Sequence, residues 1–224
     1  MSARLGLLLS CFDYSPVAED EFHDWYDTEH IPERERVSGF LQCRRWLAVD
    51  RPQAAVATYD LAAVDVLRSP GYLAIGFQNN SPWTRRVGWR CIKLLRFEGE
   101  QIVPGDALPP SGAGALLVWA FNLDGMSQDA LTDWHARTHT PLLMQEAGII
   151  APRLFRATSS THDYAALYHL ATAEAVGGDA WKTGVEQAWS SRFGSHERER
   201  FRLLARSYTR SVREGPRSVS EGPS

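Results

Sequence analysis

The chain has 224 residues, a formal net charge of −3 and a pI near 6.2. This balance lacks the basic patch of a nucleic-acid-binding protein, and three scattered cysteines without a CxxC pair predict neither a zinc knuckle nor a disulfide framework. No apolar run approaches the roughly 20 residues of a membrane span, and the N-terminal run is too short for a signal peptide, so we expect a cytoplasmic protein that contacts no membrane.

The first half of the chain predicts the order strand, helix, strand, strand, helix, strand. Its strands are short apolar runs bounded by turn residues, and its first helix carries apolar residues at helical spacing. Pro32 lacks a backbone donor and is expected to end or kink that helix. The expected ranges are 5–12, 18–36, 41–49, 54–61, 64–72 with 82–87, and 90–97.

The second half predicts the same order after a stretch rich in Pro and Gly. The expected ranges are 115–121, 127–147 with a bend near Pro141, 152–157, 164–171, 180–193 and 201–210. We therefore predict a first unit at residues 1–100, a linker at 101–114, and a second unit at 115–210. The Ser-, Arg-, Glu-, Gly- and Pro-rich residues 211–224 are expected to form a flexible tail.

A repeated motif links the two halves. The pattern D-W-aromatic-x-x-x-H-x-P begins at Asp24 and again at Asp133, which is an offset of 133 − 24 = 109 residues. Other identical residues align at the same offset without a gap. A period of this length predicts two similar folded units in tandem and not a short-period solenoid.

The predicted fold is α+β. The βαββαβ order is typical of a ferredoxin-like unit, a four-stranded antiparallel sheet with both helices on one face. The strands are apolar on both sides, so the free face of each sheet must also be covered. Two tandem ferredoxin-like units that stack sheet on sheet satisfy this need within one chain.

The motif helix resembles a known family. The residues Asp24-Trp25-Tyr26-x-x-Glu29-His30-x-Pro32 are similar to the W-Y-x-x-E-H-x-P helix of the EthD-like branch of the dimeric α+β barrel superfamily. The resemblance implies that the two units form an intrachain dimeric α+β barrel. Relatives in that superfamily include polyketide cyclases, muconolactone isomerase, cofactor-free monooxygenases and haem-binding chlorite dismutases, so the fold alone does not identify the reaction.

The candidate catalytic residues are His30, Tyr26, Glu29 and His139. A histidine with an ordinary pKa of about 6.5 exchanges protons at neutral pH, which suits enolisation or cyclisation. Tyr26 lies four residues before His30 on one helical face and could donate to a substrate oxygen. Each has a structural alternative: the histidines could bond carbonyls freed at the helix bend, Tyr26 could pack, and Glu29 could be an exposed carboxylate.

Further residues are predicted to line a substrate pocket because they are aromatic or could bind an anion. Arg44 and Arg153 could clamp a carboxylate, or could form structural bridges to Asp24 or Asp133. The H-x-x-x-H pair His135 and His139 lacks the glutamate of a zincin site, so no metal site is predicted. The predicted binding residues are Trp25, Arg44, Tyr59, Trp83, Trp134, His135, Arg153 and Tyr168.

The sequence thus favours an enzyme, an isomerase, cyclase or lyase, that needs no cofactor. Histidine acid/base chemistry would act on a small hydrophobic carbonyl or phenolic compound, and the chain could form a homodimer. Two alternatives remain: a haem- or metal-dependent oxidoreductase on the same barrel, and a non-catalytic protein that binds a small molecule.

Overall fold

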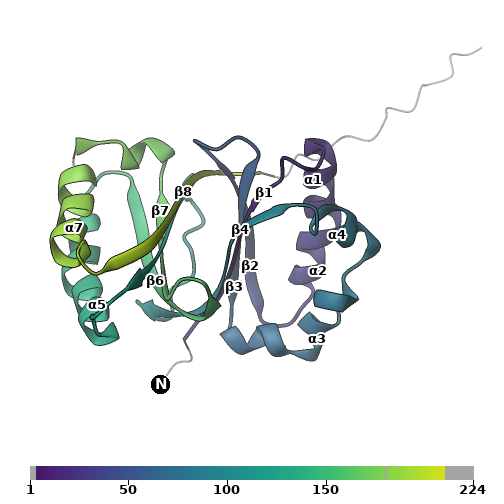
Figure 1. Ribbon diagram of the computed structural model, residues 1–224, viewed down its shortest axis with the longest axis horizontal. Helices are drawn as coiled ribbons and strands as arrows, with labels where there is room; N and C mark the ends of the chain where they lie inside the picture. The colour runs from purple at the N-terminus through teal and green to yellow at the C-terminus, as the bar shows by residue number, and fades with distance from the viewer. Residues whose placement is uncertain (1–3, 180, 210–224) are drawn as a thin grey trace, which may run out of the picture.

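The computed structural model describes residues 4–179 and 181–209, in which eight antiparallel strands close into a barrel (Figure 1). The α+β class is therefore confirmed, and the closed eight-stranded barrel is consistent with a dimeric α+β barrel fold. Around the barrel the strands follow the order β1 (Gly6–Asp13), β3 (Ala54–Leu61), β2 (Phe40–Ala48), β8 (Glu197–Ser207), β5 (Ala115–Leu123), β7 (Tyr164–Leu170), β6 (Ile149–Ser160) and β4 (Ile92–Val103).

Each half of the chain contributes four neighbouring strands, and two seams join the halves. The order is β4-β1-β3-β2 in the first half and β6-β7-β5-β8 in the second. At one seam β4 and β6 pair over six residues, whereas at the other β2 and β8 pair over three. Closure leaves no free edge among these strands, because each one has two hydrogen-bonded neighbours.

The helices lie outside the barrel on two opposite sides. Figure 1 shows α1, α2, α3 and α4 on one side, with α5 and α7 on the other. The first-half helices are α1 (Glu19–Trp25), the π-helical turn η1 (Tyr26–His30), α2 (Ile31–Glu35), η2 (Val64–Arg68), α3 (Pro70–Leu73), η3 (Phe77–Asn79) and α4 (Pro82–Val87). Those of the second half are α5 (Gln128–Trp134), the π-helical turn η4 (His135–His139), α6 (Thr140–Leu143), η5 (Ala173–Val176), the π-helical η6 (Trp181–Glu186) and α7 (Gln187–Phe193).

The motif helix passes through a π-helical turn before its proline. Proline has no N–H, and its ring clashes with the carbonyl four residues earlier in a regular helix. The Ile31 N–H instead bonds the carbonyl of Tyr26, five residues back, and the helix continues to Glu35. Thr140 and His135 repeat this bond in the second half. Each π-turn ends at the motif histidine, a type of bulge that is frequent at functional sites.

The core has three parts. The barrel interior holds inward-facing side chains of both halves, among them Leu9, Trp46 and Leu167. Between strands and helices lie a first-half cluster that includes Phe22 and Tyr59, and a second-half cluster. All eight residues of β3 are buried, because alternate side chains face the barrel interior and the helices. Both faces of these strands are therefore covered, as their apolar composition predicts.

Several element boundaries differ from the sequence-based expectations. Strand β4 continues through Val103 into the range expected as a linker, and β6 begins at Ile149, earlier than residue 152. The second motif helix ends at Leu143 and not at residue 147. The expected tail lies outside the described residues, and the division into two units stays a prediction. None of the described helices has both the length and the apolarity required to cross a membrane.

Candidate functional site

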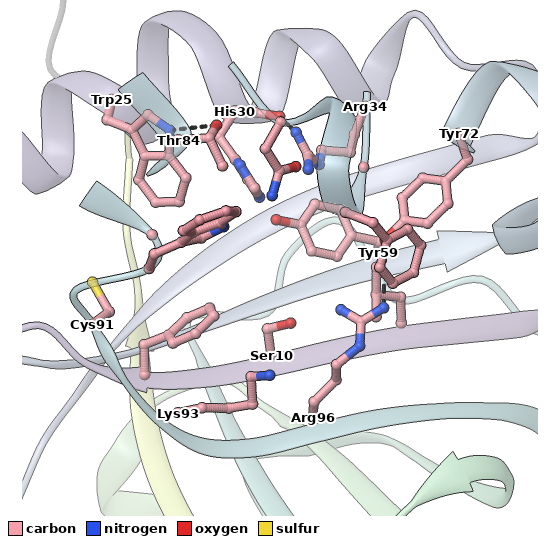
Figure 2. A pocket seen from close by; sticks show the side chains of 17 residues that line it. Ser10, Trp25, His30, Arg34, Tyr59, Tyr72, Thr84, Cys91, Lys93 and Arg96 are labelled. Carbon is pink, nitrogen blue, oxygen red and sulfur yellow. Dashed lines mark hydrogen bonds between the residues drawn. The ribbon is translucent and has the colours of Figure 1, made fainter. Parts of the chain in front are cut away.

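A cavity of about 530 Å³ lies between the first-half strands and helices (Figure 2). Strands β1, β3 and β4 form its floor, and the motif helix with the segment from α3 to Cys91 forms its roof and rim. The wall also contains a few polar groups, but much of it consists of aromatic side chains: Phe12, Trp25, Tyr59, Tyr72, Phe77 and Trp89. Such a lining is typical of a site for a small organic ligand.

His30 projects from the roof into this cavity, and its Nδ1 atom is buried without a hydrogen-bond partner among the described residues. Its ring lies 4.3 Å from that of Trp25 and 6.4 Å from that of Tyr59, measured between centroids. Burial, followed by the charges of Arg34 and other arginines, holds the pKa of His30 well below 6.5. The imidazole is therefore uncharged at neutral pH, with one ring nitrogen unprotonated, and is a weaker base than a free histidine.

A hydrogen-bond chain fixes the roof helix against α4. The Trp25 indole N–H donates to Thr84 Oγ1 at 3.0 Å, and the Thr84 hydroxyl donates to Glu29 Oε1 at 3.3 Å. The Ser81 hydroxyl also donates to Glu29, and Ser81 caps α4. Glu29 thus joins two roof elements and makes no recorded bond to His30. Trp83 lies outside the cavity lining, where its indole N–H donates to Glu21.

Tyr26 lies behind the roof, outside the cavity lining. Its ring packs against Phe22 and Trp25, and the Arg45 guanidinium lies 4.4 Å from its centroid. Burial raises the pKa of Tyr26 to about 12. Tyr26 therefore packs among other side chains, which is the structural alternative stated for it above. Tyr59, by contrast, lines the cavity, and burial raises the pKa of its hydroxyl well above 10.

The second motif histidine lies in a filled region. His139 and His135 are fully buried, with Nε2 of His139 3.1 Å from the Tyr168 hydroxyl and Nδ1 of His135 3.2 Å from the hydroxyl of Thr140. The His139 ring stacks on Trp134 at 4.6 Å. Burial lowers the pKa of His139 to about 4. Their aromatic neighbours Tyr168 and Trp134 belong to the second-half core, and neither histidine lines the first-half cavity.

Two tryptophans of the second half replace residues that line the first-half cavity. At the 109-residue offset, Ser10 corresponds to Trp119 and Tyr72 to Trp181. Ser10 and Tyr72 line the cavity, whereas both tryptophans are only 1% exposed. The indoles of Trp119 and Trp189 both donate to Glu197, at 2.9 Å each. Bulky indoles thus occupy the space that small or polar side chains leave open in the first half.

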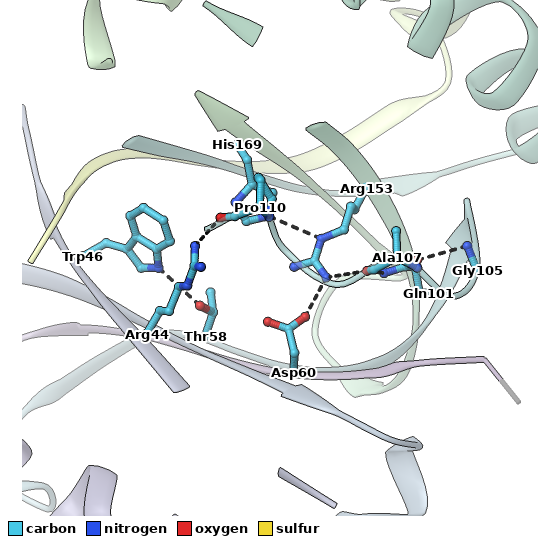
Figure 3. Close-up of polar contacts among 10 residues, drawn as sticks. All are labelled: Arg44, Trp46, Thr58, Asp60, Gln101, Gly105, Ala107, Pro110, Arg153 and His169. Carbon is cyan, nitrogen blue, oxygen red and sulfur yellow. Dashed lines mark hydrogen bonds and ion pairs between the residues drawn. The ribbon is translucent and has the colours of Figure 1, made fainter. Parts of the chain in front are cut away.

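Arg153 and Arg44 lie at one end of the barrel interior (Figure 3). Arg153 donates to Asp60 at 2.6 Å, and both side chains are only 1% exposed. Arg153 also donates to Nε2 of His169 and to the Ala107 carbonyl. Burial raises the pKa of Asp60 although Arg153 opposes that shift. This ion pair joins the two halves, and its acid is Asp60, not Asp24 or Asp133.

Arg44 makes a related contact. Its guanidinium donates to the Pro110 carbonyl at 2.6 Å and so holds the connecting segment over the barrel end. Neither this arginine nor Arg153 lines the cavity beside His30. Within the described ranges 4–179 and 181–209, no three His, Cys, Asp or Glu side chains are grouped as potential metal ligands.

Of the predicted site residues, the structure brings His30, Trp25 and Tyr59 together at one cavity. The cationic and rim residues of that cavity were not predicted from the sequence: Arg34, Phe77, Trp89, Lys93 and Arg96. No motif or local pattern in the sequence marks these residues, because the fold brings them together from separate segments of the chain. One signal was present in the sequence: where the two halves are aligned at the 109-residue offset, a small residue of the first half, Ser10, stands where the second half has a tryptophan.

No protein-family model and no curated protein matches the chain. Solved structures do match. An anthrone oxidase-like protein gives a TM-score of 0.65 at 11% identity over 92% of each chain. A chlorite dismutase variant from Candidatus Nitrospira defluvii gives 0.61 at 13% over 93% of each. A proposed monooxygenase from Lactobacillus acidophilus gives 0.54 at 10%, over 91% of this chain and 94% of that chain. At these identities the likeness shows the fold alone, the eight-stranded α+β barrel.

Proposed function

We propose that the chain is an enzyme that transfers a proton on a planar aromatic carbonyl or phenolic compound without a cofactor. The observation that carries this proposal is the cavity of about 530 Å³ at which aromatic rings, the His30 imidazole and the Tyr59 hydroxyl converge. Removal of a proton by a general base can start isomerase, cyclase and lyase reactions of such compounds. The similarity to an anthrone oxidase-like protein supports the choice of a polycyclic ketone as a first probe.

In the proposed step His30 accepts a proton from an acidic C–H or O–H bond of the substrate. The electron pair of that bond remains on the substrate and delocalises onto its oxygen. Because burial holds the pKa of Tyr59 well above 10, its hydroxyl stays protonated and can donate to this oxygen. His30 returns the proton at another substrate atom or to solvent, which restores the neutral imidazole.

The similarity to chlorite dismutase structures raises a haem-dependent reaction as the alternative. A histidine that holds a metal almost always donates its other ring N–H to a carboxylate, carbonyl or water. Nδ1 of His30 has no carboxylate or carbonyl acceptor among the described residues, and the rings of His135 and His139 pack against aromatic side chains of the second-half core. The residues present do not fit a haem ligand, so no step is derived through haem.

The test is hydrogen–deuterium exchange into anthrone, whose CH₂ group next to the rings is acidic. The reaction is run without oxygen in D₂O and followed by mass spectrometry. We expect His30→Gln to slow the enzyme-dependent exchange about 100-fold or more, a typical contribution of an acid–base group. His139→Gln should leave it unchanged if the first half holds the working site.

Two other results would contradict the proposal. Tight anthrone binding without any exchange would favour a non-catalytic binding protein. A Soret band after incubation with haemin, lost in His30→Ala, would favour the oxidoreductase alternative.

We also propose that the two halves are tandem ferredoxin-like copies of one EthD-like unit. The 109-residue offset that relates β1, β2 and β3 to β5, β6 and β7 supports this, as does the equivalent strand order, β4-β1-β3-β2 in the first half and β8-β5-β7-β6 in the second. Separate expression of residues 1–114 tests it, because an autonomous copy would pair with a second copy of itself to close a barrel.

A further inference from the structure

The cavity walls carry charge of one sign. Arg34, Lys93 and Arg96 line the cavity, and no aspartate or glutamate does so within the part of the chain that the structure describes. The whole chain has the opposite balance, with 27 acidic residues against 24 lysines and arginines. A cleft lined by one sign of charge and by apolar walls concentrates its potential and attracts ligands of the opposite sign.

Two of these cations are already held by neighbouring acids. Arg34 donates to Glu33 at 2.9 Å, and Arg96 donates to Glu98 at 2.5 Å. Arg96 also contacts the Tyr72 hydroxyl at 3.4 Å, which fixes the guanidinium at the cavity wall. Lys93 has no recorded partner in the described part of the chain, so its ammonium is available to a ligand.

The position of the cations follows from strand pairing. On β1 and β4, Ser10 lies opposite Arg96 and Phe12 lies opposite Lys93, so these side chains share the cavity floor. Figure 2 shows Lys93 and Arg96 on the strand side of the cavity and His30 on the helix side. A ligand held by its charged end on the floor therefore extends its ring system toward His30.

We infer that Lys93 and Arg96 bind an anionic oxygen group, a carboxylate or an ionised phenol, on the aromatic substrate. This inference rests on the proposed function of the same cavity and adds the charge of its substrate. Ammonium and guanidinium groups donate charge-assisted hydrogen bonds to such oxygens, which are about twice as strong as neutral ones. Lys93 is exposed at the mouth, so added salt should weaken the attraction.

The test uses two fluorescent three-ring probes of equal shape, 9-anthracenecarboxylate and neutral 9-anthracenemethanol. We expect the carboxylate to bind more tightly, and Lys93→Met to weaken its binding about tenfold with little effect on the alcohol. Lys93→Arg should retain most of the preference. Lys182→Met is the matched control, because Lys182 is the only other lysine of the chain and is exposed in the second half.

A third probe, 2-hydroxyanthracene, distinguishes the two anions. If phenolate is recognised, its affinity rises as the pH passes its ionisation, and this rise is lost in Lys93→Met. The inference is overturned if both three-ring probes bind wild-type protein equally, or if Lys93→Met leaves the preference intact. Equal binding would still leave the cavity and the His30 exchange assay unaffected, so the two failures can be told apart.

Discussion

Removing Arg153 should destabilise the barrel strongly, because it would leave Asp60 buried without its ion-pair partner. Both side chains are 1% exposed and the pair is 2.6 Å apart. Removing one member of a buried pair costs about 3–5 kcal/mol. For a protein of this size each kcal/mol lowers Tm by about 2–4 °C, so Arg153→Met should lower Tm by roughly 6–20 °C.

The decisive comparison is with the double variant Asp60→Leu with Arg153→Met. Replacement of a buried ion pair by apolar residues of similar volume is often neutral or stabilising, so the double variant should recover most of the lost stability. Urea denaturation of both singles and the double gives the coupling free energy. The control is Arg137→Met, which removes an ion pair with Asp133 whose side chains are 81% and 63% exposed.

The control should change stability by less than about 1 kcal/mol, as is usual for exposed pairs. If Arg153→Met is as mild as Arg137→Met, the argument from burial is wrong. If the double variant is no more stable than Arg153→Met, the loss comes from packing and not from an uncompensated carboxylate.

Two further predictions concern the filled half and the open half. The pKa of His139 falls from 6.5 to about 4 on burial, so the unfolded chain binds a proton between these values that the folded chain does not. The free energy of unfolding should therefore fall by about 3 kcal/mol as the pH drops from about 6.5 to about 4. Urea denaturation at several pH values measures this fall, and the free energy of unfolding should depend less steeply on pH in His139→Phe. Ser10→Trp copies Trp119 into the first half, so it should fill the cavity and abolish binding of 9-anthracenecarboxylate with Tm retained. Unchanged binding would contradict the assignment of the cavity.

Much of the fold could be predicted because the relevant signals are local. Apolar runs bounded by turn residues placed all eight strands, and β3 was predicted at the bounds that the structure has, Ala54–Leu61. The bends near Pro32 and Pro141 were expected from proline chemistry, but not their π-helical form. That form depends on which carbonyl the shifted N–H reaches, and the sequence pattern does not specify this.

The candidate site was predictable only in part, because a cavity depends on small side chains from distant elements. His30, Trp25 and Tyr59 stood out through the repeated motif and the shared offset. Ser10 and Asn80 carry no such signal, yet their small size leaves the space that the cavity occupies. The same limit applies to Arg153, whose partner Asp60 lies 93 residues away.

Closure of the barrel by one polypeptide has a genetic consequence. In a symmetric homodimer the same gene encodes both subunits, so every substitution appears at both sites. Here Ser10 and Trp119 are separate codons, and a change in one leaves the other untouched. The second half can therefore hold core tryptophans that would fill the cavity if they stood in the first half. The first half can keep its cavity, although a cavity weakens the packing around it. One half can thus specialise as scaffold without loss of the cavity in the other.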